Sequence, residues 1–446
     1  MYKKFLAATT LIVSIVGVFM IMPTYCATMD DDTLPTESHH LETESTMDLV
    51  ETEIVPIETI APTEPEINYD LITLKRNFGF YAGSAEMGTI SKIVFTDIAP
   101  ESYDEKWFAN ISETEDIVGY RIGTEVYIVG KEMYTNSSTS YMFAGTNVYN
   151  EPLWENLQII EGLDKLNTSR TKKFDKTFYG NLNLTELDLN SWDMSGATSL
   201  EMMFSKCRNL ETLHIDQWDV SNVNNFTALF QGSDWAGDMK LKNIDVSQWD
   251  TQSAVSMSHV FYGCAQLEHI DVSNWNVENV TTFSHMFADC NKLQSIDISN
   301  WNTLSVISFD AIFNDCHSLT TVDISNMPTS TCEQFSQMFE SCKNLTTIIG
   351  IEDLDVSAAN YYAFSEMFHN CSSLTSLDLS KWNVANSDNM ARMFANCPKL
   401  TYLNITGWDI SNVETVLEMF KGTYNVKTEG LDELDFSDIR GYDKMR

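Results

Sequence analysis

The sequence predicts an α/β solenoid of about ten regular coils, with a parallel β-ribbon and short helices, preceded by a strand-rich N-terminal cap. Three observations predict this fold class. A phenylalanine recurs mostly every 26 residues, a string of apolar residues at fixed spacing follows it, and a tryptophan closes most of these strings. A period of this length is typical of repeat proteins, in which neighbouring coils bury each other's apolar faces.

A column of phenylalanines sets the period. The intervals between its members are 26 residues, except for two of 31 and 29 residues that indicate insertions of 5 and 3 residues. The members are Phe178, Phe204, Phe230, Phe261, Phe287, Phe313, Phe339, Phe368, Phe394 and Phe420.

One coil can be followed clearly between residues 280 and 306. Leu293, Ile296 and Ile298 form the L-x-x-L-x-L string that is typical of leucine-rich repeats. Side chains alternate along a strand, so Ile296 and Ile298 point to one face and Asp297 to the other. Before the phenylalanine, apolar residues at 280, 283, 286 and 287 predict a short helical segment with one apolar stripe.

The chain divides into four predicted segments. Residues 1–26 predict a secretory signal peptide, because two lysines precede an apolar run of 18 residues. That run is also long enough to serve as an uncleaved membrane anchor. Residues 28–67 contain twelve Asp and Glu but no Lys or Arg, which predicts an acidic, disordered tether rich in Thr, Glu and Pro. Residues 68–141 are predicted to form the cap, and residues 142–446 the solenoid.

Two further columns favour a packed interior. Tryptophans recur three residues after the last apolar residue of the strand, and cysteines recur three residues after the phenylalanine. We interpret the tryptophans as stacked core residues, with an aromatic ligand cage as the alternative, and the cysteines as reduced and buried. The tryptophans are Trp192, Trp218, Trp249, Trp275, Trp301, Trp382 and Trp408, and the cysteines are Cys207, Cys264, Cys290, Cys316, Cys342, Cys371 and Cys397.

The outward side of the predicted ribbon supplies the candidate binding residues. Carboxylates about 5 Å apart repel one another, so either solvent and counterions or a cationic partner must screen them. A solvated face and a recognition face therefore both stay open. The column comprises Asp188, His214, Asp245, Asp271, Asp297, Asp323, Asp378 and Asp435, with the strand of the last coil placed at residues 431–436. The insertion loop at 232–240 adds Trp235, which we interpret as exposed.

The repeat resembles a known family. The string MF-x-x-C-x-x-L-x-x-L/I-D-L/I/V-S-x-W-D/N-V, seen at residues 286–306, resembles the 26-residue repeat of BspA-type leucine-rich repeat surface proteins. Residues 88–148 resemble the strand-rich leader that caps such arrays. The resemblance implies a cell-surface protein that binds host or neighbouring-cell proteins, and it assigns no individual binding residues.

Charge and motifs narrow the function. A net charge of −37 argues against nucleic acid as a partner, because phosphates would be repelled. No catalytic, metal-binding or cofactor motif stands out, so the sequence predicts no enzyme, no metal site and no cofactor. We expect a secreted or cell-surface protein that recognises unidentified extracellular or host-surface proteins, with a membrane contact only through an uncleaved N-terminal anchor. A structural surface-layer or spacer protein and an extracellular hydrolase are the alternatives.

Overall fold

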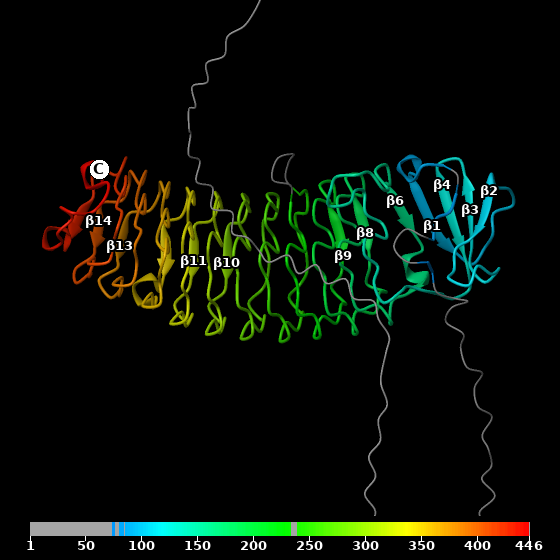
Figure 1. The fold of residues 1–446 in the computed structure, drawn as a ribbon, viewed down its shortest axis with the longest axis horizontal. Helices are drawn as coiled ribbons and strands as arrows, with labels where there is room; N and C mark the ends of the chain where they lie inside the picture. The colour runs from blue at the N-terminus through cyan, green and yellow to red at the C-terminus, as the bar shows by residue number, and fades with distance from the viewer. Residues whose placement is uncertain (1–73, 76–79, 84, 233–238, 446) are drawn as a thin grey trace, which may run out of the picture. The chain divides into compact units, whose positions relative to one another are not determined.

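The computed structural model describes residues 74–75, 80–83, 85–232 and 239–445. The predicted signal peptide, the predicted tether and Trp235 lie outside these residues. In the described part of the chain, coils follow one another side by side from the cyan strands to the red C-terminal end (Figure 1). No helix among the described residues is long and apolar enough to cross a membrane.

A mixed sheet of five strands begins the described chain. Its order is β2-β3-β4-β1-β6, with β2, β3 and β4 antiparallel and β1 parallel to both β4 and β6. β1 and β4 alternate buried and half-buried residues, which is the pattern of a sheet with one face on the core. The strands are β1 (Lys92–Thr96), β2 (Glu105–Phe108), β3 (Val118–Ile122), β4 (Glu125–Val129) and β6 (Ile159–Glu161). The sheet therefore includes β6, which lies after residue 141.

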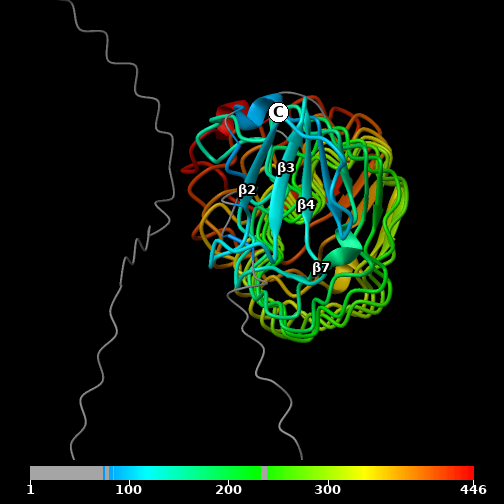
Figure 2. The same cartoon turned by 90° about the vertical axis from the view of Figure 1, so that its right-hand side faces the viewer.

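The array continues from this sheet as short parallel strands. β5 (Met133–Tyr134) pairs with β7 (Leu166–Asn167), and eight strands of three residues follow, with at most one in each coil. Viewed end-on, the coils lie over one another behind β2, β3 and β4 (Figure 2). These later strands form three parallel sheets, β8-β9, β10-β11-β12 and β13-β14-β15. They are β8 (Glu186–Asp188), β9 (Thr212–His214), β10 (Ser295–Asp297), β11 (Thr321–Asp323), β12 (Thr347–Ile349), β13 (Ser376–Asp378), β14 (Tyr402–Asn404) and β15 (Lys427–Glu429).

The register of the strands confirms the predicted solenoid. Asp297 pairs with Asp323, and Asp323 pairs with Ile349, so each step along the ladder is one coil. Only the middle residue of most of these strands is buried, because one face packs on the interior and the other faces outward. The leucine-rich repeat solenoid with a parallel ribbon is therefore confirmed.

The predicted short helices are the feature that the structure corrects. In the coil of Phe287, His285 and Asp289 have φ angles of 57° and 60°, which an α-helix does not contain. Alternate N–H groups bond to the next coil, as from Phe287 to the carbonyl of Ile312 (2.9 Å), while those between them close turns, as from Met286 to Phe283 (3.0 Å). The segment is thus a second inter-coil ladder, because the left-handed residues turn every other N–H toward the neighbouring coil. We call it the turn ladder.

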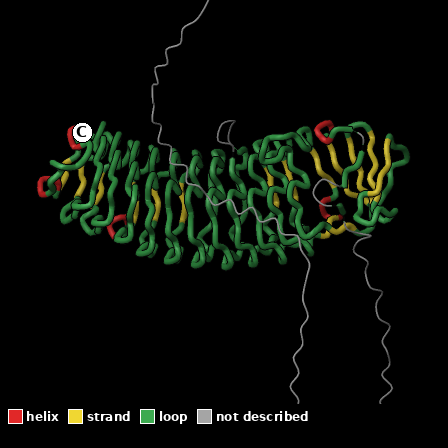
Figure 3. Tube along the Cα trace, viewed as in Figure 1, coloured by secondary structure: helices red, strands yellow, loops and turns green. Residues whose placement is uncertain are grey.

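Helices in the described residues are limited to five short 3₁₀ segments (Figure 3). They are η1 (Met87–Thr89), η2 (Leu163–Lys165), η3 (Ile351–Asp353), η4 (Leu431–Glu433) and η5 (Tyr442–Lys444). The strand predicted at residues 431–436 is wrong. The strand of this coil is β15, which pairs with β14, and the residues after it begin with η4.

Aromatic columns fill the interior between the two ladders. Phe261 stacks on Phe287 with ring centroids 5.5 Å apart, and Phe287 stacks on Phe313 at 5.9 Å. The seven column tryptophans are at most 5% exposed, so the packed-core interpretation is confirmed and the ligand cage is not. Trp301 Nε1 donates a hydrogen bond to the carbonyl of Val272 in the preceding coil (3.0 Å). The tryptophan therefore bonds to the preceding coil through its only polar side-chain atom, while its ring stacks on Phe283 of its own coil at 4.7 Å.

The cysteines of the column are free and buried, as expected. Each of them points its Sγ at the carbonyl of the phenylalanine one coil earlier, as Cys316 does to Phe287 (3.1 Å). Burial raises the pKa of Cys207 and of Cys397 to about 12. These thiols are consequently neutral and unreactive at physiological pH, because the thiolate is the reactive species.

We expect Trp275→Ala to lower the free energy of unfolding by about 3–5 kcal/mol, because it opens a cavity and removes the bond to the preceding coil. Denaturant unfolding followed by circular dichroism measures this loss. Tyr149→Ala, at a ring that is 82% exposed, is the control and should change little. A loss below about 1 kcal/mol for Trp275→Ala would contradict its place in the core.

The column thiols should resist labelling by a maleimide in the native protein and react once the protein is denatured. Burial and the raised pKa both lower the concentration of accessible thiolate. Peptide mass spectrometry assigns each labelled cysteine by residue. Rapid native labelling of the column would show that these positions are open to solvent.

Candidate functional site

The outward strand face consists of the first and third residues of the three-residue strands from β8 to β15 and of the matching residues 243, 245, 269 and 271. The third residues form the predicted column, and the strand register places neighbouring members in line. Asp188 pairs with His214, Asp297 with Asp323, and Asp378 with Asn404. Most members are exposed, and Ile349 interrupts the column with a side chain that is 44% exposed.

Asp435 does not belong to this face. The ladder partner of Asn404 is Glu429, so Glu429 occupies the column position in the last coil. Asp435 instead lines a separate depression of ≈ 460 Å³ with Trp408 and Asp409, on the corner that follows the tryptophan. The sequence prediction failed because the residues that resemble a strand, 431–436, follow the actual strand β15 and begin with the 3₁₀ turn η4.

Each column aspartate closes a local turn. Asp297 Oδ1 accepts hydrogen bonds from the backbone N–H of Ser299 (3.1 Å) and from its hydroxyl (2.7 Å). The same pair of bonds joins the aspartate and the serine two residues later in four further coils, at Asp245, Asp271, Asp323 and Asp378. This is the turn in which a carboxylate replaces a backbone acceptor. The structure thus gives the column a structural role in addition to any role in binding.

Hydrogen bonds from the turn also affect the charge of the column. The hydroxyl of Ser273 lowers the pKa of Asp271 below its usual value of 3.8, and Ser325 and Ser380 do the same for Asp323 and Asp378. A hydrogen bond to the ionised form stabilises that form. These three carboxylates are therefore charged at neutral pH, although they belong to one column.

A groove lies where the strand ladder is interrupted. In the described chain, no strand pairing or backbone hydrogen bond connects residues 243–245 with β9, or residues 269–271 with either neighbouring coil. The groove has a volume of ≈ 650 Å³, and His214, Asp245 and Asp271 from the predicted column all line it. The structure brings these three residues together, whereas Asp188 lines a different groove of ≈ 500 Å³ beside β6.

A Ser-His-Asp grouping on the turn ladder bears on the hydrolase alternative. Ser284 Oγ lies 3.1 Å from His285 Nδ1, and Asp310 Oδ2 lies 3.8 Å from the same nitrogen. A triad needs the nucleophile and the orienting carboxylate on opposite ring nitrogens, so that the ring can pass a proton between them. This grouping does not have that arrangement.

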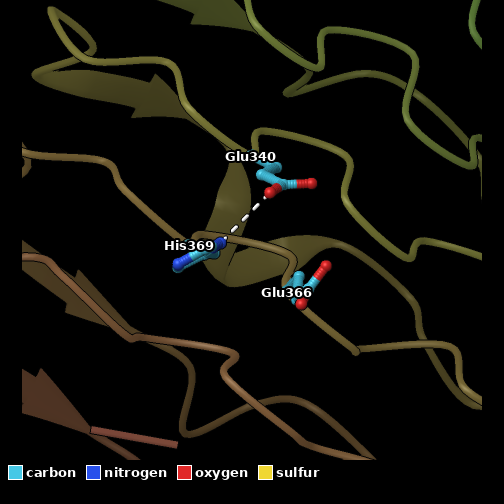
Figure 4. A group of neighbouring side chains, drawn as sticks. All are labelled: Glu340, Glu366 and His369. Carbon is cyan, nitrogen blue, oxygen red and sulfur yellow. Dashed lines mark hydrogen bonds and ion pairs between the residues drawn. The ribbon is translucent and has the colours of Figure 1, made fainter. Parts of the chain in front are cut away.

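Three potential metal ligands converge on the turn ladder. They are Glu340, Glu366 and His369, whose ligand atoms all lie within 4.8 Å of one another (Figure 4). His369 Nδ1 lies 3.1 Å from Glu340 Oε1, and the side chains are 16% exposed for Glu340 and 17% for His369. Sequence motifs missed the group because the residues come from two coils. The signal was a departure from the repeat at Glu340 and His369, since the residue directly after the column phenylalanine is neither an acid nor a histidine in the other coils.

Comparisons with known proteins identify the relatives of the chain. The family model described as "Mycoplasma protein of unknown function, DUF285" matches residues 137–240, 235–351 and 311–436. No curated protein matches the sequence. The family match, together with the parallel strand ladders, confirms the resemblance to bacterial leucine-rich repeat proteins of the BspA type.

Three solved structures are similar to this chain. A leucine-rich repeat protein from Bacteroides ovatus is 17% identical, with a TM-score of 0.35, and the match covers 78% of this chain and 90% of that one. A leucine rich cell surface protein from Faecalibacterium prausnitzii is 14% identical, with a TM-score of 0.27 and coverages of 80% and 89%. A leucine-rich repeat protein from Eubacterium ventriosum is 14% identical, with a TM-score of 0.26 and coverages of 76% and 99%.

We expect Asp323→Ala to lower the free energy of unfolding by about 1 kcal/mol, because the N–H and the hydroxyl of Ser325 lose their acceptor. Asp323→Asn keeps an acceptor oxygen and should retain most of the stability. Urea unfolding at neutral pH measures both variants. Equal losses for the two substitutions would show that charge, and not the turn, stabilises this position.

The same variants also test how the contribution of Asp323 to the stability of the fold depends on pH. Because the pKa of Asp323 is lower in the folded chain, its ionisation stabilises the fold above the unfolded pKa, and this contribution is lost as the pH falls through the folded pKa. The difference in stability between the wild type and Asp323→Asn should therefore shrink below about pH 3.8.

Proposed function

We propose that this chain, which belongs to the family described as "Mycoplasma protein of unknown function, DUF285", is an exported bacterial surface protein that recognises other proteins through its outward strand face, without catalysis. The predicted signal peptide and acidic tether support export and display away from the cell. A solenoid offers one extended, repeated surface, and such surfaces commonly bind proteins.

One observation supports the outward strand face as the binding surface. Asn404 makes the same two turn bonds, with Thr406 at 3.1 and 2.8 Å, that Asp297 makes with Ser299 at 3.1 and 2.7 Å. The turn therefore requires an acceptor oxygen and does not require a negative charge. Even so, most coils carry an aspartate, which places a row of charge on the surface beyond what folding needs. That surplus charge favours a recognition role over a purely structural one.

The chemistry of the face indicates a basic partner. In the groove beside β9, the column residues Asp245 and Asp271 are joined by Glu211 and Asp216. Carboxylates that line one groove suit a protein surface that presents Lys or Arg side chains, because such cations relieve the mutual repulsion of the carboxylates. We therefore expect the partner to be an extracellular or host-surface protein that binds through a basic segment.

A structural surface-layer or spacer protein is the second candidate. The acidic tether favours it, since a charged, extended segment serves to hold a folded part at a distance. Self-association without a heterologous partner would distinguish this function from recognition.

The triple variant Asp271→Asn, Asp297→Asn and Asp323→Asn tests the face. A partner is first captured from host extracellular and neighbouring-cell surface proteins, identified and purified. Its binding isotherm should then weaken roughly tenfold, because three exposed charge pairs contribute about 0.2–1 kcal/mol each. Thermal stability should change little, since asparagine keeps the turn bonds.

The matched control carries the same change of charge on the corner after the tryptophan. Asp193→Asn, Asp219→Asn and Asp250→Asn alter aspartates that also close local turns, outside the outward strand face. The control should bind like the wild type. Identical isotherms for all three proteins would exclude the face, and capture of nothing but the chain itself would favour the spacer.

A further inference from the structure

The turn ladder brings Glu340, Glu366 and His369 together through two backbone bonds. The N–H of His369 donates to the carbonyl of Glu366 (3.0 Å), which closes a turn and sets these two side chains beside each other. The N–H of Ser341 donates to the carbonyl of His369 (2.7 Å), which fixes Glu340 of the preceding coil next to them. The grouping is therefore held by the same ladder that holds the coils together.

Among the described residues, this grouping occurs at one place in the array. Relative to the column phenylalanines, Glu340 and His369 follow Phe339 and Phe368 directly, and Glu366 precedes Phe368 by two residues. The residues that directly follow the phenylalanine in other coils include Ser205, Ala288 and Ala395. Packing of the coil thus does not require an acid or a histidine at these positions.

A neutral amide lies between the two carboxylates. Gln337 Nε2 donates to Glu340 Oε2 (2.7 Å) and to Glu366 Oε2 (2.9 Å). Glu340 Oε2 also accepts a hydrogen bond from Asn314 Nδ2 (2.9 Å), and Gln337 is the donor that the two acids share, in the place where a cation would neutralise them. The other oxygen of Glu366 is held by Arg392 (2.9 Å), which also bonds Glu418 (2.9 Å), so Oε2 alone is turned toward Gln337.

We propose that Glu340, Glu366 and His369 bind a divalent transition-metal ion of the zinc type, which displaces the Gln337 amide. One imidazole nitrogen and two carboxylate oxygens are ligands that Zn²⁺ accepts, whereas Ca²⁺ and Mg²⁺ prefer oxygen ligands alone. Three protein ligands leave a fourth tetrahedral position for water or for a group of a bound partner.

A residue outside the ligand set orients the imidazole. His369 Nε2 lies 3.3 Å from Asn396 Nδ2 in the next coil. With the metal on Nδ1, the amide of Asn396 gives up the bond from Nδ2 to Asn370 Oδ1 (3.0 Å), turns its oxygen toward the ring and accepts the proton on Nε2. Partners of this kind fix the orientation of a ligating histidine. The site lies on the turn ladder and not on the outward strand face, so it stands independently of the proposed function.

Calorimetric titration of the chain with ZnCl₂ tests the site. His39→Ala and His40→Ala are introduced in every protein compared, so that these adjacent histidines of the N-terminal segment contribute no ligand. His369→Ala and the isosteric Glu340→Gln should each weaken zinc binding at least about tenfold, because loss of a partner that only orients a ligand already costs that much.

Gln337→Ala distinguishes zinc binding at the proposed site from nonspecific zinc binding. It removes the group that competes with the metal for both carboxylates, so zinc should bind about threefold or more tightly than to the parent protein, a gain of about 0.7 kcal/mol. The control is His317→Ala, which alters a histidine beside Asp315 on the neighbouring coil and should leave the affinity unchanged.

Two outcomes would overturn the proposal. One is zinc affinity that His369→Ala and Glu340→Gln leave unchanged while their circular dichroism matches that of the parent. The other is that Ca²⁺ binds as tightly as Zn²⁺ and that the same variants abolish this calcium binding. Glu366→Gln, which keeps shape and polarity, serves as a second ligand variant if His369→Ala fails to fold.

Discussion

The structure depends on successive coils burying each other's apolar faces. Two backbone ladders on opposite sides of each coil, the short strands and the turn ladder, hold neighbouring coils at one spacing. At that spacing phenylalanine rings stack at about 5.5 Å, and the tryptophan Nε1 and cysteine Sγ reach carbonyls of the preceding coil. A coil alone would leave its aromatic faces and these polar groups exposed, so the stability of each coil is largely contributed by its neighbours.

This arrangement places the residues that hold the fold together and the residues available for binding at different positions of the coil. The interior positions repeat because each must match the coil before and after it. The outward positions need only satisfy a turn or the solvent, and they vary from coil to coil, as His214, Ile349 and Asn404 show in the outward column. Binding chemistry can therefore accumulate at a few coils while the fold stays unchanged, on the outward strand face and on the turn ladder alike.

The sequence predicted the periodic features well and the local ones less well. The phenylalanine, tryptophan and cysteine columns were all buried as expected, since their spacing alone indicates their common environment. The helix expected before Phe287 was wrong, because an apolar spacing of three residues also arises from turns with left-handed residues such as His285. Asp435 was placed in the wrong column because an inserted 3₁₀ turn shifts the register, and a motif cannot show that shift.

The sequence by itself determined the solenoid, the length of its coils, the residues that fill its interior and the row of outward carboxylates, because each of these repeats and a period can be read from one chain. The tertiary structure alone decided which polar residues meet between coils. The interruption of the strand ladder beside Asp245 and the convergence of Glu340 on His369 depend on contacts across about 26–34 residues. Such contacts follow from how closely two coils approach, which no repeat of residue types specifies.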